Sequence, residues 1–173
     1  MNLEPLADFT VQVATPLDLG PSPQGHRRIV PITGGRFTGP GLRGEILPGG
    51  ADWQLLHPDG TIAIDTRYTL HTDDGAHLHL TTTGLRTGPP EILAALAAGH
   101  QVPSTAYYFR LFCRFESGDP RYRWLTRTLA VATAARTPGG RPLHGLRPHL
   151  STRCTCGDQR TTTPVAAALC LAT

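Results

Sequence analysis

The sequence contains no lysine, and its single asparagine is Asn2. All 16 basic residues are therefore arginine, a bias typical of a GC-rich coding sequence and not of a nucleic-acid-binding surface. Residues 1–136 hold 12 arginines and 12 acidic residues, so this part carries no net charge, and the net charge of +3 arises in residues 137–173. Because nucleic-acid binding needs a clustered basic face, we expect no nucleic-acid partner.

Long apolar runs are also missing. No stretch reaches the roughly 18 consecutive apolar residues of a membrane-spanning helix. The first six residues lack the basic and apolar regions of a secretory signal. We therefore expect a cytoplasmic protein with no membrane partner. The four cysteines, Cys113 and three in residues 137–173, do not have the spacing of a disulfide framework.

Several catalytic motifs are absent. The chain has no G-x-S-x-G, P-loop or H-E-x-x-H sequence, which leaves serine hydrolases, P-loop NTPases and zincins without support. Residues 39–44 match G-x-G-x-x-G, but Pro40 interrupts the motif and residues 42–47 alternate as a strand does. A dinucleotide-binding fingerprint needs a strand, a turn and a helix, so we predict no cofactor.

The sequence does have many short segments in which apolar and polar residues alternate. This period of two predicts β-strands, and Gly-Pro, Pro-Gly and Asp-Gly turns separate them. Residues 89–99 instead predict one short helix, with proline in its first turn and Gly99 after its end. We therefore predict a mostly β fold, a single antiparallel β-barrel of about 8–10 strands over residues 1–136. The strands are expected at 9–13, 28–32, 35–38, 42–47, 52–57, 61–72, 77–83, 107–116 and 123–135.

Five motifs in series resemble the bacterial domain-of-unknown-function family 3237. They are RIVPITGG at 28–35, LPGGADWQ at 47–54, TRY at 66–68 with DDG at 73–75, YYFR at 107–110 and RFESGDPRYRWL at 114–125. The resemblance covers residues 3–135. It implies a small β-barrel that forms a homodimer and binds, or acts on, small organic molecules of aromatic or secondary metabolism. It implies no established set of catalytic residues.

Residues 137–173 depart from that family's pattern. They contain no glutamate and no aromatic residue, and they alternate little before residue 165. We expect this segment to be a divergent, poorly ordered tail, and a closing strand to be missing. Either a lineage-specific extension or a change of reading frame accounts for such an end.

Two groups of residues have side chains that bind metals. A three-residue hairpin loop at 73–75 would place His71, His77 and His79 on one face, which suits zinc or iron. That face is also the polar face of the hairpin, so solvent exposure is the simpler interpretation. His149 with Cys154, Cys156 and Cys170 has no second paired spacing and is a weak zinc motif. We predict no metal site.

A pocket inside the barrel is the stronger hypothesis. The candidate catalytic residues are Asp52 and Glu116 as general bases and Tyr68 as hydrogen-bond donor. A barrel of about eight strands has room for one small ligand. Arginine binds carboxylates or phenolates, and planar rings stack on tryptophan. The candidate substrate-binding residues are Trp53, Tyr108, Arg110, Trp124 and Thr126. The alternative is that Arg110 pairs with Glu116 and the aromatic residues only fill the core.

Two classes of function fit such a pocket. The first is a cofactor-independent enzyme, a dehydratase, cyclase or isomerase acting on an aromatic or polyketide-like metabolite. The second is a non-catalytic barrel that binds or carries a hydrophobic metabolite. An enzyme needs an acid or base within reach of the ligand, whereas a carrier needs only apolar walls and an anchor.

Overall fold

The computed structural model describes residues 3–137 and 143–151, which form mostly β structure. The helical segments are α1 (Pro90–Ala97) and three short 3-10 turns, η1 (Ser104–Ala106), η2 (Pro120–Tyr122) and η3 (Leu125–Arg127). The predicted fold class is confirmed. The strands of the described residues are β1 (Leu3–Pro5), β2 (Asp8–Val13), β3 (Leu17–Ser22), β4 (Gly25–Thr38), β5 (Arg43–Leu56), β6 (Ile62–Thr72), β7 (His77–Thr87), β8 (Tyr108–Glu116), β9 (Ala130–Thr137) and β10 (Leu143–Ser151).

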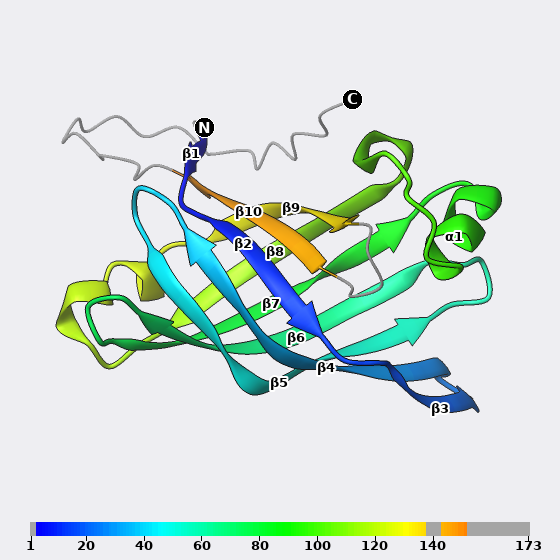
Figure 1. The fold of residues 1–173 in the computed structure, drawn as a ribbon, viewed down its shortest axis with the longest axis horizontal. Helices are drawn as coiled ribbons and strands as arrows, with labels where there is room; N and C mark the ends of the chain where they lie inside the picture. Colours follow the sequence, from blue (N-terminus) through cyan, green and yellow to red (C-terminus); the bar gives the residue numbers. More distant parts are fainter. Residues whose placement is uncertain (1–2, 138–142, 152–173) are drawn as a thin grey trace, which may run out of the picture.

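The strands form one antiparallel sheet that curls around the core (Figure 1). From β4 to β9 each strand pairs with the next one along the chain, and β2 pairs with β4. Strand β10 pairs with β9 on one side and with β2 on the other, which closes the ring. Strand β3 pairs with β4 alone, and β1 pairs with β10.

The expectation that a closing strand is missing is wrong. Strand β10 comes from the segment expected to be a tail, and it pairs with β9 from Leu143 to Leu150. Backbone hydrogen bonds make this ladder, so pairing does not depend on clear side-chain alternation. The rest of that segment, 138–142 and 152–173, lies outside the described residues.

Two predicted turns are interruptions within longer strands. The runs 28–32 and 35–38 are both parts of β4. The runs 42–47 and 52–57 are both parts of β5, apart from residues 42 and 57, which lie just outside the strand. The pairing between β4 and β5 shifts between Pro31 and Gly35, and that between β5 and β6 shifts between Leu47 and Ala51. The Pro-Gly-Gly sequence therefore makes an irregularity that bends a barrel strand and does not end it.

The predicted hairpin and helix are confirmed. His71 pairs with His77, and the Thr72 N–H donates to the Ala76 carbonyl oxygen across the three-residue loop 73–75. Gly75 in this loop has a φ of 88°. Helix α1 has proline at its start, and Gly99 follows it with a φ of 82°. The predicted strand 123–135 is only partly right, since η2 and η3 lie within residues 120–127 and β9 begins at Ala130.

The two ends of the barrel differ. Helix α1 lies at one end, beside the last residues of β7 (Figure 1). At the other end the Tyr122 hydroxyl donates to Asp74, which joins the segment after β8 to the hairpin of β6 and β7. In residues 3–137 and 143–151 no helix has the length and apolar character needed to cross a membrane.

Candidate functional site

Three arginines lie at the α1 end of the barrel, each at the end of an inward-facing series on its strand. Arg28 precedes Val30 and Ile32 on β4, Arg86 follows Thr82 on β7, and Arg136 follows three buried alanines on β9. Together they line a cavity of about 350 Å³, the mouth cavity. Its other walls include Val30 and Ile62 from the barrel and Leu93 and Ala97 from α1.

The buried N–H groups and the positive charges of these arginines have few partners among the described residues. Arg86 is only 5% exposed, and the Nε atoms of Arg86 and Arg28 are buried without a hydrogen-bond partner. Each such group costs about 1–3 kcal/mol. Burial, together with the positive charges of Arg136 and Arg28, lowers the pKa of Arg86 to about 10. Burial also lowers the pKa of Arg28 and Arg136. All three remain charged near neutral pH.

Arg136 also ties the helix to the barrel. Its Nη1 donates to the Leu96 carbonyl oxygen of α1 at 2.7 Å, and its backbone N–H donates to the Tyr107 hydroxyl at 2.9 Å. The Leu96 contact joins α1 to β9 beside the mouth cavity, and the Tyr107 contact joins β9 to the residue before β8.

Asp52 faces inward from β5, where it is 8% exposed. Gln54 Nε2 donates to its Oδ2 at 2.6 Å, and the Asp65 backbone N–H donates to its Oδ1 at 3.3 Å. Arg28 in turn donates to Gln54 Oε1 at 2.9 Å. Burial raises the pKa of Asp52 above its ordinary value, although these hydrogen bonds and the Arg86 charge oppose the rise. A carboxyl group of this kind gains and loses a proton at a higher pH than an exposed aspartate does.

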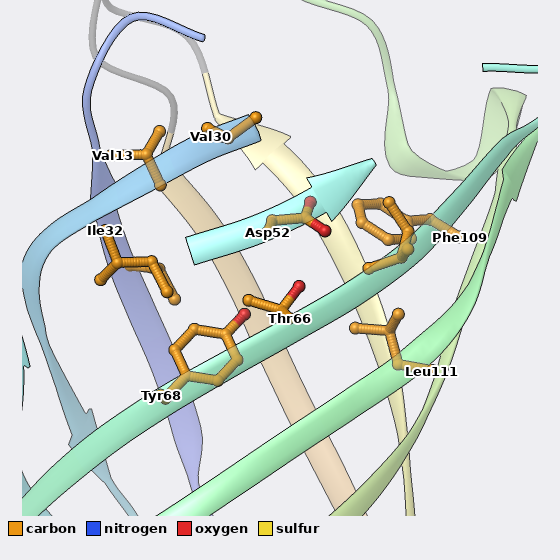
Figure 2. A pocket seen from close by; sticks show the side chains of 10 residues that line it. Val13, Val30, Ile32, Asp52, Thr66, Tyr68, Phe109 and Leu111 are labelled. Atoms are coloured by element: carbon orange, nitrogen blue, oxygen red, sulfur yellow. The ribbon is translucent and has the colours of Figure 1, made fainter. Parts of the chain in front are cut away.

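A second, inner cavity of about 10 Å³ lies beside Asp52, Thr66 and Tyr68. Figure 2 shows the hydroxyl groups of Thr66 and Tyr68 turned toward the same space as the Asp52 carboxylate, among apolar side chains. This volume is close to that of one water-sized group. Val30 lines both cavities, so the inner cavity adjoins the mouth cavity.

Tyr68 is buried, at 5% exposure. Burial and the nearby Asp52 charge raise the pKa of its phenol. The hydroxyl therefore stays protonated at neutral pH and can donate a hydrogen bond. Of the predicted site residues, the structure brings Asp52 and Tyr68 together.

The other expected residues of β8 point the wrong way. Its burial alternates with the odd-numbered residues inside, so Tyr108, Arg110 and Glu116 face outward and the inward placement expected for them is wrong. Arg110 lies over the Tyr108 ring at 5.1 Å and donates to the Phe109 carbonyl oxygen. Glu116 is near His79, at 3.9 Å. Tyr108, Phe112 and Leu85 are exposed on this outer face. The predicted homodimer is not tested by these observations and stays a prediction.

The expected tryptophans do not line the site either. Trp53 follows Asp52 and faces the opposite side of the strand, where Arg67 lies 4.9 Å from its ring. Trp124 packs against the core from the segment between η2 and η3. Thr126 is exposed in η3, and its hydroxyl donates to the Arg123 carbonyl oxygen. Residues 123–127 do not form a strand, so the expected alternation does not apply to them.

The three histidines of the hairpin lie on its outer face. His71 and His77 stack with ring centroids 4.8 Å apart, His71 Nδ1 is 3.4 Å from Glu45, and His79 lies toward Glu116. Among residues 4–136, whose side chains the structure describes, no group of three or more metal-binding side chains is suited to hold an ion. Of the other candidate set, His149 lies in β10, whose side chains are not described, and Cys154, Cys156 and Cys170 lie outside the described residues.

Sequence reasoning missed Arg28, Arg86, Arg136 and Gln54. The alternation of buried and exposed residues, continued to the end of each strand, is the signal that finds them. On β7 the even-numbered residues 78, 80 and 82 are buried, so Arg86 is expected to face inward as well. The same rule predicts that the even-numbered residues of β8 face outward. Arg110, Arg114 and Glu116 are all even-numbered, and three charged residues rarely share a buried face.

Comparison with known proteins identifies the family. The model of the family described as protein of unknown function (DUF3237) matches residues 1–147. A UPF0311 protein of Clostridium acetobutylicum is 37% identical over 139 residues, which cover 80% of this chain and 88% of that protein.

Solved structures show the same fold. A conserved protein of unknown function from Rhodopseudomonas palustris is 36% identical with a TM-score of 0.80, and a β-barrel-like protein from Acinetobacter baumannii is 46% identical with a TM-score of 0.72. Both alignments cover 86% of this chain and 95% of the other chain. An enzyme from Penicillium herquei, 21% identical with a TM-score of 0.59 over 84% of this chain and 93% of its own, shares the fold alone. The resemblance found in the sequence motifs is thus confirmed, and the chain belongs to the DUF3237 family of proteins of unknown function.

Proposed function

We propose that this barrel binds a small aromatic or polyketide-like metabolite at the α1 end and catalyses a proton-transfer reaction on it without a cofactor. The observation that carries the proposal is the position of Asp52: a buried carboxyl group with a raised pKa lies beside a water-sized cavity, next to a larger cavity. A perturbed carboxyl group in a cleft is characteristic of functional sites.

The two cavities suggest a division of roles. The mouth cavity, at about 350 Å³, is within the range of small-ligand sites. The inner cavity, at about 10 Å³, takes only a small group of the substrate, such as a hydroxyl or a carbonyl oxygen. A small leaving group favours dehydration over cyclisation or isomerisation.

In a dehydration, ionised Asp52 takes a proton from the carbon next to the substrate carbonyl group. The negative charge moves onto the carbonyl oxygen, and Tyr68 donates a hydrogen bond to it. Asp52 then returns the proton to the hydroxyl group on the adjacent carbon, the C–O bond breaks and water leaves. A raised pKa suits this role, because a base works best with a pKa close to the working pH.

The second candidate function is a barrel that carries a hydrophobic metabolite. Its support is the apolar part of the mouth cavity, formed by Val30, Ile62, Leu93 and Ala97. In a carrier Asp52 would have no chemical task. The likeness to the Penicillium herquei enzyme does not decide between the two functions, because it extends to the fold alone.

The test compares wild type, Asp52→Asn and Glu116→Gln. Each protein is incubated with a small-molecule extract of the organism that encodes it, and consumed and bound compounds are identified by mass spectrometry. Glu116→Gln is the matched control, since Glu116 is a carboxylate on the outer face.

The proposal predicts that wild type and Glu116→Gln convert the same compound, whereas Asp52→Asn binds that compound and leaves it unchanged. If all three proteins bind and release a compound unchanged, the carrier function is correct. Equal turnover by Asp52→Asn and wild type would remove Asp52 from the mechanism.

A further inference from the structure

The mouth cavity has an excess of positive charge. Among the described residues that line the mouth and inner cavities, Arg28, Arg86 and Arg136 are cationic and Asp52 alone is anionic. Three positive charges against one negative charge leave an excess of two. Asp18 also attracts Arg28, but it lies on exposed β3 and pairs with His26.

The donors on these arginines are also incompletely used. The buried Nε atoms of Arg28 and Arg86 have no hydrogen-bond partner. A guanidinium group offers five N–H donors in a planar fork, which matches the two oxygens of a carboxylate. Buried polar groups in native proteins nearly always have partners. Arg28 and Arg86 line the mouth cavity, so a ligand in that cavity is placed to supply acceptors to their guanidinium groups.

We infer that the mouth cavity is an anion-recognition site, in which Arg28, Arg86 and Arg136 bind the carboxylate or phenolate group of an organic acid. The inference rests on the proposed function and narrows its substrate class to ligands that carry one such group on an apolar body. Val30, Ile62 and Leu93 supply the apolar wall that the body contacts. A small inorganic anion would use the arginines and leave this wall unoccupied.

The arginines also reach the proposed acid–base group. Arg28 donates to Gln54, which donates to Asp52. An anion bound at Arg28 is therefore linked to the Asp52 carboxyl group through Arg28 and Gln54. This arrangement orients an acidic substrate with its anionic end in the mouth cavity and its reacting end toward the inner cavity.

The experiment uses three probes on the intact chain: benzoate, its neutral analogue benzamide, and sulfate. Binding is followed as the rise in melting temperature and by calorimetry, at probe concentrations up to about 10 mM, which detects dissociation constants near 1 mM. The variants are Arg86→Gln, Arg28→Gln and Arg110→Gln. Arg110 is the matched control, because it lies on the outer face of β8. Arg28 is less buried than Arg86, so Arg28→Gln keeps the test valid if Arg86→Gln does not fold.

The inference predicts that benzoate binds at least tenfold more tightly than benzamide and sulfate, that either mouth substitution removes this preference, and that Arg110→Gln keeps it. Equal affinity for benzoate and benzamide would overturn the anion site and leave the proposed small-molecule function standing. Sulfate binding as tight as benzoate binding would overturn the organic-acid assignment. Binding of none of the probes, or an equal loss in Arg110→Gln, would overturn the site as well.

Discussion

Gln54 Nε2 donates a 2.6 Å hydrogen bond to Asp52 Oδ2 inside the barrel. Both residues lie on β5 and face inward, two positions apart, as the alternation of a strand requires. The other end of the same amide accepts a hydrogen bond from Arg28. Gln54 thus connects the proposed proton-transfer group with the mouth cavity.

Replacing Gln54 tests this connection. In Gln54→Leu the carboxylate loses a donor that stabilises its ionised form, so the pKa of Asp52 should rise above its wild-type value. The carboxyl carbon of Asp52, followed by NMR across a pH series, reports the change. Gln101→Leu, at an exposed position, should leave the titration as in wild type; an unchanged titration in Gln54→Leu would contradict the connection.

Asp52 should make the protein less stable as the pH rises. Its pKa is higher in the folded state than in the unfolded chain, so over the interval between the two values the folded state holds a proton that the unfolded state has lost. Unfolding then releases a proton, and the free energy of unfolding falls with pH by at most about 1.4 kcal/mol per unit. The fall begins near pH 3.8 and ends above the folded pKa.

Urea denaturation at a series of pH values measures this slope. Asp52→Asn should lose the contribution, whereas Glu116→Gln should keep it. The same slope in Asp52→Asn and wild type would show that another group causes it.

The arginine of β7 should reduce stability in the absence of a ligand. Arg86 is a buried charge with an unpartnered Nε, and Arg28 and Arg136 repel it. Arg86→Met keeps much of the side-chain volume and removes the charge, so the free energy of unfolding should rise by about 1–4 kcal/mol. Thermal and urea unfolding measure the change. Arg110→Met should change stability little, and a large loss of stability in Arg86→Met would mean that the charge is structurally required.

The hairpin between β6 and β7 depends on Gly75. Its φ of 88° lies in the left-handed region, although a Cβ there would contact nothing within 4 Å. Gly75→Ala should therefore cost about 1–2 kcal/mol through backbone strain alone. Gly118 also has open space around it but no positive φ, and Gly118→Ala should be close to neutral by urea denaturation. Equal effects of the two substitutions would contradict this explanation.

Alternation and turn residues predict most of the barrel, because a half-buried strand must place apolar side chains on one face. They do not separate a turn from a bulge: the glycines at 49–50 lie inside β5, where the pairing with β6 shifts. The facing of residues after such a shift is not fixed by those before it. The prediction places both Asp52 and Trp53 in the site, but adjacent strand residues face opposite sides, and only Asp52 faces inward.

The sequence analysis did not identify the arginines of the mouth cavity, for a different reason. Charged residues at strand ends usually reach solvent, so their place in the alternation does not normally show whether they face the interior of the barrel. Here β4, β7 and β9 each bring one arginine to the same rim of the barrel, beside α1. The three side chains therefore line one cavity. That convergence depends on the closure of the sheet, including the pairing of β10 with β9 and β2, which the sequence did not predict.

The most direct test of the central claim is native mass spectrometry of the chain purified from its own organism, compared with the same sample after denaturation. The account predicts a retained small organic acid that is present in wild type and Arg110→Gln, is absent in Arg86→Gln and dissociates on denaturation. A ligand retained equally by Arg86→Gln, or a retained metal ion without any organic molecule, would contradict it.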